Sequence, residues 1–250
     1  MTQRQVKAAV LLIGDELLSG RTQDVNLQTI AKFLAPLGVQ VAEARAVADI
    51  PAEIIAAVNE LRAKYDYVFT TGGIGPTHDD KTADAMAAAF GVNIDVRDDA
   101  RAILEAHYKG ANNMNEGRLR MARIPDTASL ISNPVSKAPG FQIGNVFVLA
   151  GVPSIARGML DDVGKRIEGG APIEMRSYEL IGAKESEIAG VLADLQTAHP
   201  DVSVGSYPGF DENGFLVRVV TRSSDRAALT SAAQALEATL PGGKWLDAAD

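Results

Sequence analysis

A glycine-rich turn is the part of this sequence best suited to chemistry. An apolar segment ends at Thr71, and the next six residues read GGIGPT. Glycine lets the backbone bend tightly and approach a ligand, and free N–H groups before a helix attract anions. The pattern is neither a Walker loop nor the dinucleotide fingerprint, whose last glycine would fall on His78. We interpret the turn as a phosphate-binding loop, the alternative being a turn that only redirects the chain. The candidate binding residues are Gly72, Gly73, Gly75, Pro76 and Thr77.

Acidic residues follow this turn directly and suggest a metal site. Asp79 and Asp80 precede a helix pattern, and Asp80 falls on the same expected helical side as the inward-facing Ala83 and Ala87. Carboxylates beside a phosphate group are suited to hold Mg²⁺ or a similar ion. The alternative is a capping box, in which Thr77 and Asp80 satisfy the first N–H groups of the helix.

Acids also follow the first two apolar strands of the sequence. Asp15 and Glu16 come after the first strand, with Asn26 shortly beyond them, and Asp49 comes directly after the second. The carboxyl ends of parallel strands meet at one edge of a sheet, where open α/β sheets bind ligands. We therefore expect these side chains to reach the same crevice as the glycine-rich turn. Helix capping is an equally weighted alternative for Asp24 and Asp49.

A polar loop further along the chain offers more ligand contacts. Asn133 and Pro134 open it, and Lys137 follows. Asn133 could hydrogen-bond the edge of a ligand and Lys137 could bind a phosphate. The alternative is an irregular turn with a solvated lysine.

His78 is a further candidate for an acid, a base or a ligand-binding residue, although a lone histidine more often has none of these roles. Without cysteine or a Gly-x-Ser-x-Gly motif, a metal-activated water is a better candidate nucleophile than a side chain.

The composition excludes several classes of protein. The 250 residues include no cysteine, which rules out disulfides and thiolate metal sites. The net charge is −8, and residues 171–250 carry 12 acidic and 6 basic side chains, so no basic stripe is available to bind nucleic acid. The longest uncharged run, Pro139 to Ala156, is interrupted by glycines and a proline, unlike a membrane span. Because the N-terminus lacks the layout of a signal peptide, we expect a cytoplasmic protein with no membrane partner.

Strand and helix patterns alternate in the first two thirds of the chain. Strands are predicted over residues 8–13, a continuous apolar run, and over 39–47 and 67–71, and each is followed by a helix with apolar residues on one face. Three such units predict an α/β domain, a three-layer sandwich with a mostly parallel sheet between helices. Beyond them we expect a helical stretch over residues 95–122 with a break at residues 112–115, then short strands over 128–149 and a closing helix over 154–167.

A second domain is predicted after a glycine-rich linker at residues 168–172. Its patterns predict the order βαββα, with the two central strands joined through Asn213-Gly214 and with Asp225 capping the last helix. This order is typical of a small α+β domain. The expected elements cover residues 174–181, 185–198, 202–207, 215–221 and 226–240. The predicted domain boundaries are residues 1–168 and 173–250.

These motifs resemble the competence/damage-inducible protein A (CinA) family, which belongs to the molybdenum-cofactor biosynthesis (MoCF, molybdopterin-binding) domain superfamily. The resemblance covers nearly the whole chain. It rests on the segments Ile13 to Gly20, Asp24 with Asn26, Thr70 to Asp80, Asn133-Pro134, and Ala138 to Gly140. The C-terminal segment with Val204 to Pro208 is similar to the small KH-like domain that follows the MoCF domain in that family, although it lacks a Gly-x-x-Gly clamp for RNA.

The resemblance implies an α/β fold that binds a pterin or an adenine nucleotide over the glycine-rich turn. It implies either metal-dependent pyrophosphate hydrolysis of ADP-ribose or FAD, or binding of molybdopterin or a nucleotide without turnover. By position, Asp80 and Asp49 would be catalytic, and Asp79 would join them as a metal ligand. The ion would be Mg²⁺, Mn²⁺ or Co²⁺, with K⁺ as a further candidate. Family habit favours a homo-oligomer.

Several positions depart from the family pattern. Longer members continue into an amidase domain that acts on nicotinamide mononucleotide, and since this sequence ends at Asp250 we expect no such activity. Thr127 and Ser136 stand where the family has glycine, and Lys137 replaces a small residue. These positions lie along the expected ligand rim, so hydrolysis and binding without turnover both stay open.

Overall fold

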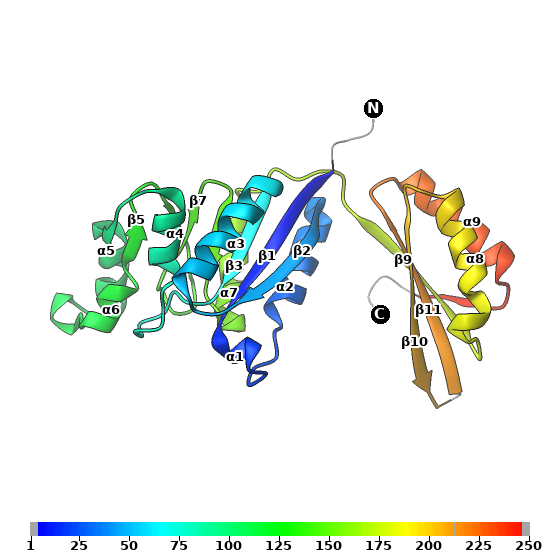
Figure 1. Ribbon diagram of the computed structural model, residues 1–250, viewed down its shortest axis with the longest axis horizontal. Coiled ribbons are helices and arrows are strands. Elements are labelled where there is room, and N and C mark those ends of the chain that lie inside the picture. Colours follow the sequence, from blue (N-terminus) through cyan, green and yellow to red (C-terminus); the bar gives the residue numbers. More distant parts are fainter. Residues whose placement is uncertain (1–4, 213, 247–250) are drawn as a thin grey trace. The chain divides into compact units, whose positions relative to one another are not determined.

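The chain forms two compact units in the computed structural model (Figure 1). The structure describes residues 5–212 and 214–246, so the predicted turn residue Asn213 lies outside the described part. The N-terminal unit comprises residues 5–34 and 39–168, and the C-terminal unit comprises residues 35–38 and the described residues from 169 onward. The glycine-rich turn lies in the N-terminal unit.

A six-stranded sheet forms the centre of the N-terminal unit, in the order β2-β1-β3-β8-β7-β6. The first four strands are parallel neighbours, and only β7 runs in the opposite direction. The inner strands β1 and β3 are buried on both faces, which explains their continuous apolar sequences. The prediction of a mostly parallel sheet is confirmed. The strands are β1 (Val6–Ile13), β2 (Val39–Val47), β3 (Tyr67–Thr71), β6 (Ser129–Ile131), β7 (Gly140–Ile143) and β8 (Val146–Leu149).

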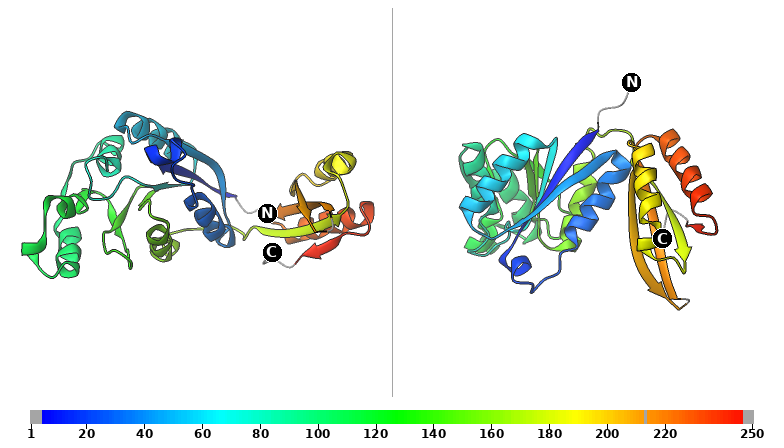
Figure 2. Two further views of the ribbon diagram at one scale, coloured as in Figure 1. Left: turned by 90° about the horizontal axis from the view of Figure 1, so that it is seen from below. Right: turned by 45° about the vertical axis from the view of Figure 1, so that its right-hand side comes forward.

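Helices cover both faces of this sheet (Figure 2), as the three-layer prediction requires. On one face α3 and α4 pack together, and their buried side chains share a core with Ala9, Leu11 and Ile13 of β1. On the other face α2 packs against α7. Asp24 caps α2 as predicted, because its carboxylate accepts the N–H groups of Asn26 and Leu27, each at 3.1 Å. The helices are α1 (Asp15–Leu18), α2 (Asn26–Leu34), α3 (Pro51–Lys64), α4 (Thr82–Phe90) and α7 (Pro153–Gly164).

Between α4 and β6 the chain makes an excursion that the sequence analysis predicted only in part. The expected helical stretch contains α5 (Asp98–His107) and α6 (Glu116–Arg120), separated by the 3₁₀ turn η2 (Ala111–Asn113) at the expected break. The prediction is wrong at its start, where β4 (Ile94–Val96) replaces helix, and β5 (Arg123–Pro125), just beyond its end, was not predicted; the two strands form an antiparallel pair. Strands of three residues carry little local pattern and are stabilised by their distant partner.

The C-terminal unit is an antiparallel sheet in the order β10-β11-β9-β12, with α8 and α9 packed against it. The predicted βαββα order is observed, and β12 is an additional strand that the sequence analysis missed. Asp225 caps α9 as predicted, accepting the N–H groups of Ala227 and Ala228. The elements are η1 (Ala35–Leu37), β9 (Glu174–Ile181), α8 (Glu185–Ala198), β10 (Ser203–Asp211), β11 (Gly214–Ser223), α9 (Arg226–Thr239) and β12 (Lys244–Leu246).

Tyr178 and Val219 lie on neighbouring strands in the core of the C-terminal unit, where Ile188 of α8 and Leu236 of α9 also pack.

The linker predicted at 168–172 contains neither helix nor strand. In neither unit do the described residues include a helix with the length and apolar content needed to cross a membrane.

The junction between β1 and the end of β3 depends on Gly72. Its φ is 106°, in the left-handed region, and a Cβ atom there would lie less than 3.0 Å from the carbonyl oxygen of Ile13. Both the dihedral angle and the close approach therefore require glycine.

We expect Gly72→Ala to lower the free energy of unfolding by about 3 kcal/mol or more, because strain in φ adds to a backbone clash. Gly20→Ala is the matched control, since Gly20 has a φ of 72° but no atom within 4 Å of an added Cβ. Strain in φ alone should cost about 1 to 2 kcal/mol there. Urea denaturation of both variants measures the difference, and equal losses would show that the approach to Ile13 contributes nothing.

Candidate functional site

The turn after β3 leaves three consecutive amide groups free. The N–H of Gly72 donates to the carbonyl oxygen of Leu149 at 3.2 Å, and the N–H of Thr77 donates to Asp80 at 2.8 Å. The N–H groups of residues 73–75 have no acceptor among the residues that the structure describes. Successive free N–H groups in a turn can bind an anion. The donors of a phosphate-binding turn would therefore be residues 73–75 rather than Gly72 or Thr77.

Asp80 lies in a loop and not on a helix, contrary to the prediction. Helix α4 begins at Thr82, and the Thr77 hydroxyl donates to Asp80 Oδ2 at 2.6 Å, so these two residues close a turn ahead of the helix. The hydrogen bond from the Thr77 N–H to Asp80 matches one half of the alternative capping box, but it lies in a turn ahead of the helix and not at the first residues of α4. Ala83, which we expected on the buried helical face, is only half-buried. Local hydrogen bonds of a short polar side chain compete with helix formation, and here they prevail.

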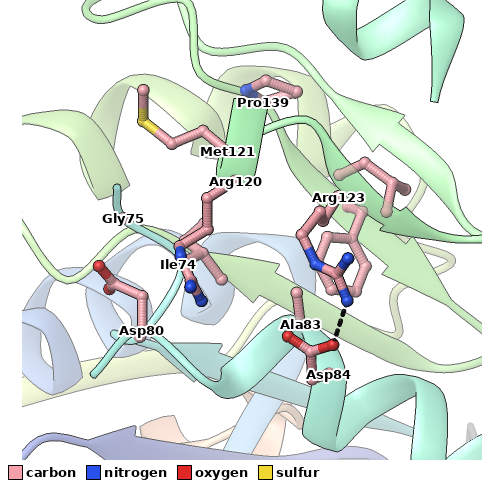
Figure 3. Close-up of a pocket in the computed structure, with 12 residues that line it drawn as sticks. Ile74, Gly75, Asp80, Ala83, Asp84, Arg120, Met121, Arg123 and Pro139 are labelled. Carbon is pink, nitrogen blue, oxygen red and sulfur yellow. Dashed lines mark hydrogen bonds and ion pairs between the residues drawn. The ribbon is translucent and has the colours of Figure 1, made fainter. Parts of the chain in front are cut away.

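A shallow pocket that is open to solvent lies beside the turn (Figure 3). It is formed by two segments that are distant in the sequence: the turn with the start of α4, and the end of α6 with β5. Pro139, just before β7, and Phe141 of β7 complete the lining. The lining residues are Gly73, Ile74, Gly75, Asp80, Ala83, Asp84, Arg120, Met121, Arg123, Ile124, Pro139 and Phe141.

Four charged side chains line this pocket. Arg123 and Asp84 form an ion pair, so their charges compensate each other. Asp80 lies against the turn, where a Cβ on Gly75 would come within 2.7 Å of its Oδ2. Arg120 has no hydrogen-bond or ion-pair partner in the described part of the chain. The pocket therefore offers one carboxylate held by the loop and one guanidinium that is free to bind a ligand.

A second group of charges surrounds Asp49, at the ends of β1 and β2. The N–H of Asp15 donates to Asp49 Oδ2 at 3.0 Å, and the N–H of Asp49 donates to Asp15 Oδ1 at 3.4 Å. Burial raises the pKa of Asp49; the charges of Asp15, Glu16 and Asp79 raise it further, and the hydrogen bond from Asp15 opposes them. The structure thus brings Asp15, Glu16, Asp49 and Asp79 into electrostatic contact, whereas Asp80 lies in the pocket.

These acids do not form a ready metal site. Across residues 5–212 and 214–246, no three or more histidine, aspartate or glutamate side chains come close enough together to hold an ion. The three predicted metal ligands are therefore not assembled around one point. A bound cation would nevertheless relieve the repulsion between Asp49 and the neighbouring carboxylates.

Asn26 lies beneath the same sheet edge and is 6% exposed. Its Nδ2 donates to the carbonyl oxygen of Gly151 at 2.8 Å, and Gly151 in turn lies against Gly72. Its Oδ1 and the hydroxyls of Thr70 and Thr82 are three of the four buried side-chain atoms that lack a protein partner among the described residues. Unpaired buried polar atoms are rare in folded proteins, so their presence around one turn is a further sign of a ligand site.

The amide of Asn133 is used inside its own loop. The side chain is 4% exposed, and its Oδ1 accepts the N–H groups of Val135 and Ser136 at 3.0 and 3.1 Å. Its Nδ2 donates to Ser136 Oγ and to the carbonyl oxygen of Ala138, both at 2.7 Å. Asn133 therefore orders the loop, and its side chain keeps no free donor for a ligand.

The other two residues predicted in this loop are exposed. Pro134 packs beside Gly158 of α7, and Lys137 has a φ of 66°. Neither contributes to the pocket lining, to which the end of the loop supplies Pro139 and the following strand supplies Phe141. Contact of Pro134 or Lys137 with a ligand stays a prediction.

The sequence analysis missed Arg120 and Arg123. Both lie in the segment that was interpreted only as a helical stretch with a break. The signal that could have found them is three arginines within residues 118–123, directly before a short apolar strand. His78, which was considered, has a 96% exposed side chain and does not line the pocket.

Comparison with known proteins identifies the family. The probable molybdopterin binding domain matches residues 9–169. A CinA-like protein of Syntrophus aciditrophicus is 34% identical over 93% of this chain and 59% of that protein. The crystal structure of the protein CinA from Thermoplasma acidophilum is 34% identical with a TM-score of 0.61, and it covers 65% of this chain and 99% of that chain. This chain belongs to the CinA family.

Other similarities connect this CinA-family chain with FAD synthases. The middle domain of FAD synthase matches residues 180–249. A probable FAD synthase of Caenorhabditis elegans is 31% identical over 99% of this chain and 53% of that protein. The chain thus spans between about half and three fifths of the length of these two curated relatives. A protein of Aeropyrum pernix, 32% identical, matches over 92% of this chain and 91% of its own length.

The raised pKa of Asp49 predicts a dependence of stability on pH. When a carboxyl has a higher pKa in the folded state than in the unfolded state, stability falls as pH rises through that interval. We therefore expect Asp49→Asn, which keeps an oxygen for the Asp15 N–H, to be more stable than the parent protein at about pH 7 and to lose this advantage towards about pH 4. Urea denaturation in the presence of a chelator measures both conditions.

Asp99→Asn is a control of opposite sign. A hydrogen bond from Arg97 lowers the pKa of Asp99, so its charged form stabilises the folded protein above the ordinary pKa. This variant should be less stable than the parent protein at about pH 7. A similar loss in Asp49→Asn would contradict the electrostatic repulsion inferred around Asp49.

Proposed function

We propose that the protein hydrolyses the pyrophosphate bond of ADP-ribose, or of a related dinucleotide such as FAD, with the help of a divalent metal ion. The observation that carries this proposal is the turn at residues 73–75, whose three N–H groups have no acceptor among the described residues. The turn follows β3 at the sheet edge where open α/β folds bind ligands. Similarity to FAD synthases supports a dinucleotide as the ligand.

The pocket beside the turn has surfaces for a flat ring as well as for phosphate. Ile74, Met121 and Pro139 line it together with the charged residues (Figure 3). Small-molecule sites combine an apolar lining with a few polar groups. Because the pocket is open, one half of a dinucleotide would lie against its lining and the other half would extend over its rim.

Asp49 and Asp79 are the carboxylates from which a metal site would be assembled on binding, with Asp15 and Glu16 beside them, since the described residues contain no ready group of three. Their oxygens are the donors that Mg²⁺, Mn²⁺ and similar hard ions prefer, and K⁺ is a further candidate. A bound divalent ion would supply an activated water and neutralise charge on the phosphate. Asp80 lies in the pocket, on the ligand side of the same loop.

Binding of molybdopterin or a nucleotide without turnover is the second candidate function. It is favoured by the fact that the described residues contain no assembled group of three metal-binding side chains. It is also favoured by the two hydrogen bonds that engage Asp80 Oδ2 with Thr77. Such a protein would serve molybdenum cofactor biosynthesis as a binding protein. A cytoplasmic location and a homo-oligomeric state stay predictions.

An assay of AMP release tests the proposed hydrolysis. The protein is incubated with ADP-ribose or FAD and Mg²⁺, Mn²⁺ or Co²⁺. We expect turnover by the parent protein and a loss of about a hundredfold or more in Asp80→Asn, because the carboxylate nearest the turn loses its charge. Asp98→Asn, an equivalent change on α5 outside the pocket lining, should keep full activity.

Binding measurements separate the two candidate functions. Asparagine keeps a side-chain oxygen that can accept a hydrogen bond from Thr77, so Asp80→Asn should unfold within a few degrees of the parent protein. Thermal stabilisation of the parent protein by ADP-ribose with no AMP release would refute hydrolysis and support a binding protein. Full turnover by Asp80→Asn would remove Asp80 from the reaction.

A further inference from the structure

Arg120 differs from the other arginines of the excursion between α4 and β6. Arg97 pairs with Asp99 and Arg101 pairs with Glu105. Arg123 pairs with Asp84, and Arg118 lies over the ring of Tyr108, 3.8 Å from its centroid. Within the described residues Arg120 alone among these five arginines has no such partner, and it lines the pocket. A guanidinium without a carboxylate partner remains available for an anion.

The position of Arg120 is fixed by contact between α6 and the glycine-rich turn. A Cβ on Gly117 would lie 3.0 Å from the carbonyl oxygen of Pro76, so the helix approaches the turn at a residue without a side chain. Asn115 caps this short helix by accepting the N–H of Arg118 at 2.9 Å. Residues three apart lie on the same side of a helix, so Arg120 lies on the side where Gly117 meets the turn.

The pocket therefore presents an anion with two kinds of donor. The turn supplies the free N–H groups of residues 73–75, and α6 supplies the guanidinium of Arg120. In the view of Figure 3 the Arg120 guanidinium lies between Asp80 and the ion pair of Asp84 with Arg123. Backbone N–H groups and a guanidinium together match the oxygen atoms of a phosphate group.

We propose that Arg120 binds a phosphate group of the ligand against the turn and is the charged group on which binding of a phosphate ester at this site depends. The four charges that line the pocket sum to zero, and the Arg123 charge is compensated by Asp84. Attraction of an anionic ligand therefore depends on Arg120. The inference rests on the proposed function, since it takes the turn to be the ligand site, but it concerns binding and holds with or without hydrolysis.

Calorimetric titration with ADP-ribose and with inorganic pyrophosphate tests this assignment. We expect Arg120→Gln to bind both probes about tenfold to a hundredfold more weakly than the parent protein, the effect of losing one charged hydrogen-bonding group. Arg120→Lys should lose less, because it keeps the charge without the planar donors. Arg101→Gln, which removes the same charge from α5 outside the pocket lining, should bind within about twofold of the parent protein.

Thermal unfolding of each variant shows whether the fold is kept, and Arg120→Met serves as a second neutral variant if Arg120→Gln is unstable. Parent-like binding by a folded neutral variant would overturn the assignment. So would an equal loss in Arg101→Gln, which would indicate a general charge effect, or a parent protein that binds neither probe.

AMP release distinguishes failure of this inference from failure of the proposed function. Binding that depends on Arg120 without AMP release would refute hydrolysis and leave the inference standing. AMP release with an unchanged KM in Arg120→Gln would refute the inference and leave hydrolysis standing.

Discussion

The close approach of Gly72 to Ile13 is the constraint on which the candidate site depends. A side chain at Gly72 would collide with the Ile13 carbonyl group, and one at Gly151 would lie 3.2 Å from the Cα of Gly72, so three chain segments meet at backbone distance. The hydrogen bond from Gly72 to Leu149 closes this junction. Beyond it the backbone leaves the sheet, and the next three N–H groups lose the partners that a strand would supply. The close packing of these backbone segments thus produces the turn whose free N–H groups are proposed to bind an anion.

A close backbone approach at a glycine also positions α6, which forms the second wall of the pocket. Helix α6 has five residues, too few for a stable helix by itself, so contacts must hold it in place. Gly117 allows it to rest on Pro76, Asn115 satisfies its first turn, and stacking of Arg118 on Tyr108 ties it to the preceding segment. The guanidinium of the pocket is consequently placed by contacts between residues about forty positions apart in the sequence.

This dependence on distant contacts explains what the sequence could and could not predict. The strands at 39–47 and 67–71 were predicted to the residue, since Gly38 directly precedes the first and Gly72 directly follows the second. The cap at Asp225 was predicted for the same reason. Asp80 was misplaced because its bonds to Thr77 compete with the helix, a choice that local pattern does not decide. Arg120 was missed because its role arises only when α6 meets the turn.

The neighbours Asp79 and Asp80 belong to different groups of charges, and this division bears on how an anion could bind. The charge of Asp79 contributes to the raised pKa of Asp49, although a hydrogen bond from Thr77 lowers the pKa of Asp79 itself, whereas Asp80 lies in a pocket whose charges balance. A phosphate on the turn would add negative charge near both groups. Since carboxylates facing an anion raise its free energy in the site, binding requires a positive charge at each group. Arg120 meets that requirement in the pocket, whereas the repulsion at Asp49 would be relieved by protonation of its carboxylate or by a bound cation.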